Sequence, residues 1–416
     1  MMSKLISKEK IEQACENLKE VVIETPFLRQ ENLSQSYQAN IYLKREDMQV
    51  VRSFKIRGAY NKMCSMQLDH PEKGILCASA GNHAQGVAMA CTKLDIKGKI
   101  YMPTTTPAQK IAKVKFFGGD KVEVILHGDT FDEAYKIAKQ KSDLEEIPFI
   151  HPFNDEDVIA GQGTIAVEML RQADCEFDYL FVAVGGGGLL AGVGSYWKQV
   201  SPNTKIIAVE AEGAPSLSES LKEKQVVRLD KINSFADGIA VREMGKLTYP
   251  ICADVISDNV LVPEGMICSK ILQLYNDEAI VAEPAGAVGI AALEYYKEEL
   301  VGKNVAVILC GGNNDVTRTE DIRERALLYE GLKHYFIINF PQRAGALKEF
   351  LHVLGPDDDI SFFQYTKKTN KTAGPATVGI ELKRKKDFSA LVDKMTAANI
   401  KFQHINNNPM LFEILI

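Results

Sequence analysis

The sequence predicts an α/β protein with a mostly parallel sheet covered by helices on both faces, followed by a smaller ferredoxin-like α+β module. Two observations carry this prediction. Up to about residue 310, short apolar runs of strand character alternate with segments of helical periodicity, and such alternation produces right-handed crossovers between parallel strands. Near residue 318 the rhythm changes to a β-α-β-β-α-β order, which is typical of a ferredoxin-like module.

The elements of the first part follow from the period of the apolar residues. Short, mainly apolar runs predict strands, and apolar positions three or four residues apart predict helices. Asp129 or Thr130 is the expected cap of the helix over 130–142. The expected strands are 41–44, 75–78, 100–102, 121–126, 180–184, 205–210 and 305–309, and the expected helices are 8–19, 56–66, 84–94, 108–116, 130–142 and 189–199.

The C-terminal part begins with a charged helix over 318–328. Alternating strand and helix patterns follow it, and the chain ends on apolar residues. The expected strands are 334–340, 360–367 and 375–382, and the expected helices are 345–354 and 388–398.

Composition excludes several classes of function. At 416 residues the chain is long enough for two or three domains, and its net charge of −6 argues against a dedicated nucleic-acid-binding protein. No stretch approaches 18 uninterrupted apolar residues, and the first residues contain no apolar core of a signal peptide, so no membrane segment is expected. The eight cysteines contain no C-x-x-C pair and the seven histidines are scattered, so we expect reduced thiols in the cytoplasm and no metal site.

A run of four glycines, 185–188, lies between the apolar run 179–184 and a helical segment that begins at Leu189. Such a turn lets backbone N–H groups converge at the positive end of a helix, which suits a phosphate group; a tight strand–helix connection is the simpler alternative. Leu189 and Leu190 stand where a nucleotide-hydrolysing loop needs lysine and serine or threonine. The glycine spacing also departs from G-x-G-x-x-G, although Glu210 ends the next strand, so a nicotinamide cofactor is disfavoured.

Lys55 lies between Phe54 and Ile56, shortly before Gly58. Most lysines are solvated surface charges, but a lysine in an apolar pocket has a lowered pKa, because desolvation disfavours the ammonium form. Its free amine can form a Schiff base. Together with a phosphate-binding turn, this lysine indicates pyridoxal 5′-phosphate, which needs an imine-forming lysine, a phosphate anchor, a ring partner and hydrogen bonds to its phenolic oxygen and pyridine nitrogen.

Two further motifs contain glycine and follow apolar runs. The segment 79–83 opens the helix 84–94, and a polar helix N-terminus suits a substrate carboxylate; ordinary capping by Ser79 or Asn82 is the alternative. The segment 310–314 ends the strand 305–309. Ligands of parallel sheets lie beyond the carboxyl ends of the strands. We therefore expect both segments and the glycine run to lie together at this edge of the sheet.

On these motifs the chain resembles the biosynthetic threonine dehydratases, or threonine deaminases, of the tryptophan-synthase-β-like (fold type II) class of pyridoxal-phosphate enzymes. The resemblance covers nearly the whole chain. It implies two open, twisted, mostly parallel sheets in a catalytic domain 1–320 with a small subdomain at about 50–152, a linker 321–331 and an ACT-like regulatory domain 332–416. The matching segments are KRED 44–47, SFKIRG 53–58, SAGNHAQG 79–86, GGGGL 185–189, EPAGA 283–287 and GGNN 311–314, with GLKHY 331–335, FP 340–341, GAL 345–347 and GPA 374–376 in the tail.

The resemblance implies a role for each site residue. Lys55 would hold pyridoxal 5′-phosphate as an internal aldimine and then take the Cα proton, Phe54 would pack against the ring, and Asn82 would bind the phenolic oxygen. The position of Cys310 faces the pyridine nitrogen, where many such enzymes carry serine; neither group is acidic enough to keep that nitrogen protonated, which suits elimination over transamination. The implied phosphate-binding residues are Gly185, Gly186, Gly187, Gly188 and Leu189, and the implied substrate-binding residues are Ser79, Ala80, Gly81, Asn82 and His83.

The implied reaction converts L-threonine to 2-oxobutanoate and ammonia, the first step of isoleucine biosynthesis, in a homotetramer regulated by isoleucine or valine. Three alternatives share parts of the pattern. A serine racemase would need a second base directly before Gly-Asn-His, where this chain has Ala80. A catabolic serine/threonine dehydratase would usually lack the module 332–416, and a non-catalytic branched-chain amino-acid sensor would not need Lys55. A bound cation near Glu210 would depend on that single acidic residue.

Overall fold

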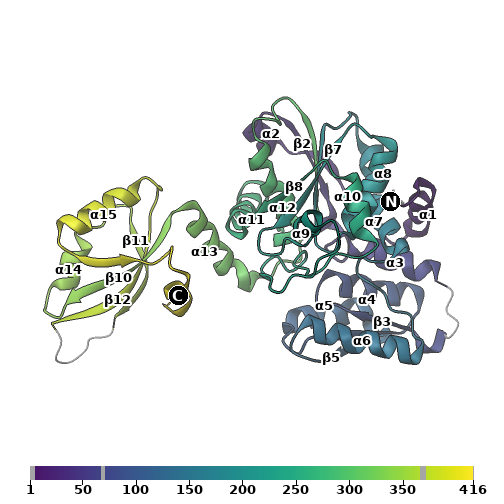
Figure 1. Ribbon diagram of the computed structural model, residues 1–416, viewed down its shortest axis with the longest axis horizontal. Helices are drawn as coiled ribbons and strands as arrows, with labels where there is room; N and C mark the ends of the chain where they lie inside the picture. The colour runs from purple at the N-terminus through teal and green to yellow at the C-terminus, as the bar shows by residue number, and fades with distance from the viewer. Residues whose placement is uncertain (1–4, 67–70, 366–371, 416) are drawn as a thin grey trace. The chain divides into compact units, whose positions relative to one another are not determined.

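The computed structural model describes residues 5–66, 71–365 and 372–415 and divides the chain into two compact units, Met1–Asp315 and Val316–Ile416 (Figure 1). Each unit has its own sheet or sheets and its own apolar core. Helix α13, Thr319–Glu330, groups with the second unit, so the division falls a few residues before the predicted end of the catalytic domain. The boundaries predicted at residues 320 and 332 stay predictions.

The larger sheet of the first unit has the strand order β1-β2-β9-β6-β7-β8. Its strands are β1 Phe27–Arg29, β2 Asn40–Arg45, β6 Tyr179–Ala183, β7 Lys205–Ala211, β8 Asp258–Val262 and β9 Asn304–Leu309. All neighbouring strands are parallel except β1, which pairs with β2 in the antiparallel sense. β6 is buried along its whole length, which explains its continuous apolar sequence.

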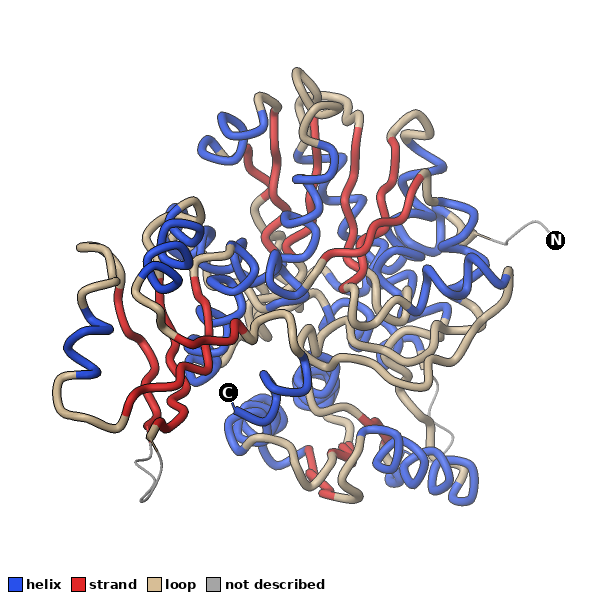
Figure 2. The backbone as a smooth tube through the Cα atoms, turned by 60° about the vertical axis from the view of Figure 1, so that its left-hand side comes forward, coloured by secondary structure: helices blue, strands red, loops and turns tan. Residues whose placement is uncertain are grey.

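The smaller sheet consists of the parallel strands β3 Ile75–Ala78, β4 Gly98–Met102 and β5 Val122–Leu126, and Figure 2 shows these three short strands apart from the larger sheet. Helices α4 Asn82–Leu94 and α5 Ala108–Gly118 lie against it, and α6 Phe131–Glu145 packs on its other face. Thr130 caps α6 in a capping box with Glu133, which confirms one of the two predicted caps. The fold-class prediction of two mostly parallel sheets is therefore confirmed.

Most of the remaining helices of the first unit lie around the larger sheet, whereas α1 and α3 pack mainly against other helices. Figure 1 shows one group of them, including α7, α8 and α10, on one side of the sheet and another group, including α11 and α12, on the other. The sequence patterns predicted α1, α3 and α8 and missed the others. They are α1 Lys8–Leu18, α2 Glu31–Tyr37, α3 Lys55–Ser65, α7 Glu156–Gln172, α8 Gly188–Val200, α9 Ser216–Glu223, α10 Thr248–Val255, α11 Glu264–Glu278 and α12 Pro284–Ala291. Within the described ranges, no helix combines the length and the apolar character that crossing a bilayer requires.

The second unit has one antiparallel sheet with the strand order β11-β12-β10-β13. Its elements follow the predicted β-α-β-β-α-β order, and Phe336, Val378 and Met395 lie in its apolar core. Of the predicted strand 360–367, residues 366 and 367 lie outside the described residues. After α13, the elements are β10 Lys333–Pro341, α14 Ala346–Leu351, β11 Asp359–Tyr365, β12 Ala373–Glu381, α15 Asp387–Ala397, β13 Lys401–His404 and α16 Pro409–Leu415.

Candidate active site

The segment before helix α3 is held against the loop that follows β9. Ser53 forms a β-bridge with Gly311, and the backbone N–H of Phe54 donates to the carbonyl of Cys310 at 3.2 Å. Helix α3 begins at the next residue, Lys55. The two segments are far apart in sequence, yet these bonds bring Lys55 to the carboxyl end of β9, the edge at which ligands of parallel sheets bind.

Lys55 is half-buried, and polar as well as apolar groups lie near its amine. Its Nζ donates to the carbonyl of Pro152 at 3.1 Å and lies 5.1 Å from the centre of the Phe54 ring. Burial lowers the pKa of Lys55 from 10.5 to about 8, although the nearby Cys310 and Glu283 partly oppose that shift. A substantial fraction of the amine is therefore neutral, and nucleophilic, near physiological pH.

This pKa predicts a specific pH dependence. Because only the neutral amine attacks a carbonyl, the rate at which cofactor-free protein captures pyridoxal phosphate is expected to rise with pH through about 8 and to level off above it. Stopped-flow absorbance between about pH 6 and pH 10 measures this rate, with free Nα-acetyl-lysine as the control. A rate that keeps rising to the ordinary lysine value of 10.5 would contradict the assigned environment.

The four glycines form a tight connection between β6 and α8. Gly187 has φ +87° and precedes the first residue of α8, and a Cβ on Gly186 would overlap the ring of Phe153. Thr248 donates to the carbonyl of Gly186 at 2.6 Å, and Cys252 donates to that of Gly187 at 3.4 Å. In contrast, no described residue accepts a hydrogen bond from the backbone N–H groups of Gly186, Gly187 and Gly188, which are all buried. A row of such donors at a helix N-terminus fits a phosphate group.

The loop after residue 150 connects the glycine run to Lys55. Pro152 accepts the hydrogen bond from Lys55, and the adjacent Phe153 packs against Gly186 and Gly188. The structure therefore brings the predicted Schiff-base lysine and the predicted phosphate-binding turn to one place. No sequence pattern indicated this loop, because its role depends on carbonyl and ring contacts that leave no local signature.

Asn82 belongs to a hydrogen-bonded group that also contains Glu283 and Asn313. Its Nδ2 donates to Oε1 of Glu283 at 2.7 Å, and its Oδ1 accepts from Nδ2 of Asn313 at 2.8 Å. Burial and then the charge of Asp237 raise the pKa of Glu283 to about 7, although Asn82 opposes the shift. Glu283 is the main site residue to which sequence reasoning assigned no role; the EPAGA segment 283–287 was its only signal.

The segment Ser79 to His83 forms the turn into helix α4. The N-cap is Gly81, and no side chain caps the helix, so the alternative in which Ser79 or Asn82 is an ordinary cap is wrong. His83 is directed into the protein, where its Nε2–H donates to the carbonyl of Ile150 at 2.9 Å, and burial lowers its pKa to about 3. His83 is thus neutral and can offer a carboxylate only its backbone N–H, whereas residues 79–82 are partly exposed.

Cys310 follows β9 and is 2% exposed. Its Sγ donates to the carbonyl of Ala285 at 3.2 Å. Burial, with the nearby Glu283, raises the pKa of the thiol well above its ordinary value, so the group stays protonated. A neutral thiol at this position does not supply the charge that would keep a pyridine nitrogen protonated.

Glu210 accepts hydrogen bonds from other residues of the described chain. The fully buried carboxylate accepts from the backbone N–H groups of Leu217 at 2.6 Å and Ser218 at 2.9 Å, and from the Ser218 hydroxyl at 2.8 Å. These donors belong to the first turn of α9, where a carboxylate offsets the positive end of the helix.

Comparisons with known proteins agree with this geometry. Residues 18–311 match the family model described as pyridoxal-phosphate dependent enzyme, and residues 324–415 match the C-terminal regulatory domain of threonine dehydratase. The chain is 55% identical to the biosynthetic L-threonine dehydratases IlvA of Halalkalibacterium halodurans, over 99% of both chains, and of Bacillus subtilis, over 99% and 98%. The processed threonine deaminase isoform 2 of Solanum lycopersicum is similar in structure, with a TM-score of 0.72 and 41% identity, over 78% of this chain and 96% of that chain.

Proposed function

The chain belongs to the pyridoxal-phosphate-dependent enzymes, in the family of the biosynthetic threonine dehydratases, and from this membership we propose its reaction and the residues that perform it. The reaction is the dehydration and deamination of L-threonine to 2-oxobutanoate and ammonia. The observation that carries the proposal is that Lys55, with a pKa of about 8, lies across the Pro152–Phe153 loop from the glycine run. The N–H groups of Gly186 to Gly188 have no acceptor among the described residues.

The residues that the structure brings together fit the cofactor. Lys55 would attach it, the N–H groups of 185–189 would bind its phosphate, and Asn82 would donate to its phenolic oxygen. Phe54 would pack against its ring, and the neutral thiol of Cys310 would face its pyridine nitrogen. When bound, pyridoxal phosphate supplies an electron sink for the carbon next to the amino group.

The remaining chemistry belongs to the chain itself. The positive end of helix α4, at residues 79–83, would hold the substrate carboxylate and so orient the Cα–H bond. Lys55, released from the cofactor when substrate binds, would take the Cα proton as general base. Ala80 offers no acid or base on that turn, so the site favours elimination over racemisation.

The alternatives are less well supported. A catabolic dehydratase does not account for the regulatory domain that residues 324–415 match. A non-catalytic sensor does not account for membership in an enzyme family or for the lowered pKa of the half-buried Lys55.

A turnover assay tests the reaction. Purified protein saturated with pyridoxal phosphate is incubated with L-threonine, and 2-oxobutanoate and ammonia are both measured. We expect equal amounts of the two products from L-threonine and none from D-threonine. Unchanged L-threonine, or its conversion to D-allo-threonine by inversion at Cα, would contradict the proposal.

We further propose that the second unit is an ACT-like regulatory domain, and that isoleucine, the end product of the pathway, acts on it as a feedback inhibitor, with valine as a second effector. A regulatory effect requires a second site with different affinity for two states of the enzyme. Turnover of the full chain is expected to fall as isoleucine is added, and a chain that ends at Asp315 is expected to lose this response. An equal response from both chains would refute the assignment.

The working form that we propose is a cytoplasmic homotetramer without nucleic-acid or membrane partners. The absence of C-x-x-C pairs supports a reducing compartment and the net charge of −6 supports the absence of a nucleic-acid partner, whereas the tetramer is proposed from the family resemblance.

A further inference from the structure

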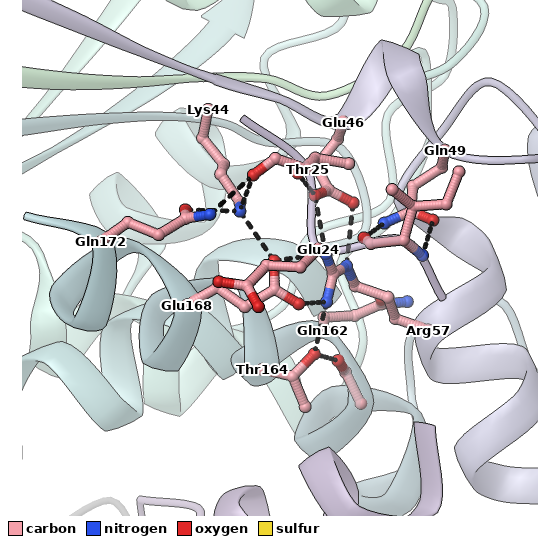
Figure 3. A network of polar contacts seen from close by, with 12 residues as sticks. Glu24, Thr25, Lys44, Glu46, Gln49, Arg57, Gln162, Thr164, Glu168 and Gln172 are labelled. Atoms are coloured by element: carbon pink, nitrogen blue, oxygen red, sulfur yellow. Dashed lines mark hydrogen bonds and ion pairs between the residues drawn. The ribbon is translucent and has the colours of Figure 1, made fainter. Parts of the chain in front are cut away.

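Helix α3 carries a buried charged residue, Arg57, that the proposed reaction does not use. Figure 3 shows its guanidinium between the carboxylates of Glu46 and Glu168. Glu46 lies just after β2, and Glu168 lies on α7. Lys44, at the end of β2, is the second cation of the group and pairs with Glu168 at 2.7 Å.

Every donor of the Arg57 side chain has an acceptor. Nε and Nη2 each donate to Glu46 at 2.8 Å, Nη1 and Nη2 donate to Glu168 at 2.6 and 2.9 Å, and Nη1 also donates to Thr164 at 3.1 Å. These bonds use all five N–H groups of a guanidinium. The planar fork therefore has a single orientation, and the backbone that carries it is fixed to two other elements.

The second cation completes the network. The three donors of Lys44 bind the carbonyl of Thr25 at 2.7 Å, Glu168 at 2.7 Å and Gln172 at 3.0 Å. Two cations and two carboxylates give no net charge, so the network adds none near Lys55. When all of its hydrogen bonds are made, a buried ionic network of this kind fixes one arrangement of its side chains. Its net contribution to the free energy of folding is a less reliable effect.

Backbone contacts also anchor the first turn of α3, because Ser53 and Phe54, just before it, bind the loop after β9. No side chain caps the helix, and the N–H of Gly58 donates to Oε1 of Gln162 at 3.2 Å. A Cβ on Gly58 would overlap Gln162, so the turn lies tightly on α7. Lys55 is the first residue of this turn and Arg57 is the third.

We propose that Arg57 is a positioning residue for the reaction: its clamp on Glu46, Glu168 and Thr164 fixes the first turn of α3 and thereby the amine of Lys55. The proposal rests on the proposed function, in which this amine takes the Cα proton. Displacement of a reacting group by about 1 Å costs about 10² in rate, so a small shift of this turn has a measurable effect.

The test is the variant Arg57→Lys, which keeps the charge but has three donors and cannot fork onto both carboxylates. We expect kcat to fall about 10²-fold while KM for threonine changes little, because substrate binding does not use this turn. Without substrate, the rate at which cofactor-free protein captures pyridoxal phosphate should also fall. The matched control is Arg45→Lys: Arg45 forks onto Asp47 at 2.8 and 2.7 Å and onto no residue of α3 in the described chain.

A milder variant keeps the proposal falsifiable if Arg57→Lys does not fold. Thr164→Val removes one of the five acceptors without changing any charge and is expected to lower kcat and the capture rate several-fold. The proposal would be overturned if Arg45→Lys lowered kcat and the capture rate as much as the Arg57 and Thr164 variants do. It would also be overturned if their losses in kcat and capture rate matched the unfolded fraction in thermal melts. If the wild type captures cofactor but does not convert threonine, the proposed function fails. In that case the capture rates of the wild type and the variants still decide whether Arg57 positions Lys55.

Discussion

Replacing Lys55 with alanine is expected to abolish threonine turnover, with a loss in kcat of about 10⁴-fold or more, because one amine both attaches the cofactor and takes the Cα proton. The variant should fold, because the Lys55 side chain makes one hydrogen bond, to the carbonyl of Pro152, and no ion pair among the described residues. The measurement is 2-oxobutanoate formation at saturating threonine and cofactor.

The control for this variant is Lys62→Ala on the same helix. Lys62 pairs with Asp155 at 2.8 Å and is partly exposed, so its loss should leave turnover close to the wild-type rate. If Lys55→Ala retained more than about 1% of wild-type turnover, Lys55 would not be the base.

Replacing Gly186 with alanine is expected to weaken pyridoxal phosphate binding about ten- to a hundredfold. The added Cβ would overlap the ring of Phe153, and forcing an extra carbon into a packed site typically costs about 1–3 kcal/mol. The loop would have to shift, and its N–H groups would no longer converge. A fluorescence titration of cofactor-free protein measures the change.

Relief of the overlap provides the control. The double variant Gly186→Ala with Phe153→Leu should recover part of the affinity, because the smaller side chain leaves room for the new methyl group. Unchanged affinity in Gly186→Ala alone would show that the glycine run does not hold the phosphate.

The parts of the fold that were predictable share a physical cause. Strands such as β6 and β9 are buried on both faces, so their sequences are continuous apolar runs that are visible without any partner. The glycine run follows such a strand directly, and its φ of +87° at Gly187 explains why glycine occupies that position. Lys55 stood out because apolar residues flank it on both sides.

The parts that were not predictable depend on distant contacts or on weak local patterns. Asn82 and Glu283 meet across 201 residues of sequence, and nothing near either residue indicates the other. β8 lies at the sheet edge and begins with Asp258 and Asn259, so its apolar run is limited to residues 260–262. α7 contains Gly161 and Gly163, which allow close packing against α3 and α8 but reduce helix propensity, so the pattern around Asp155 did not indicate a helix.

The most direct test of the account is the identity of the residue that carries the cofactor. Protein loaded with pyridoxal phosphate is reduced with borohydride, digested and analysed by mass spectrometry, with turnover measured on the same preparation before reduction. We expect to find the reduced cofactor on Lys55, and we expect no turnover after reduction. A label on a different lysine, in a preparation that converts threonine, would contradict this assignment.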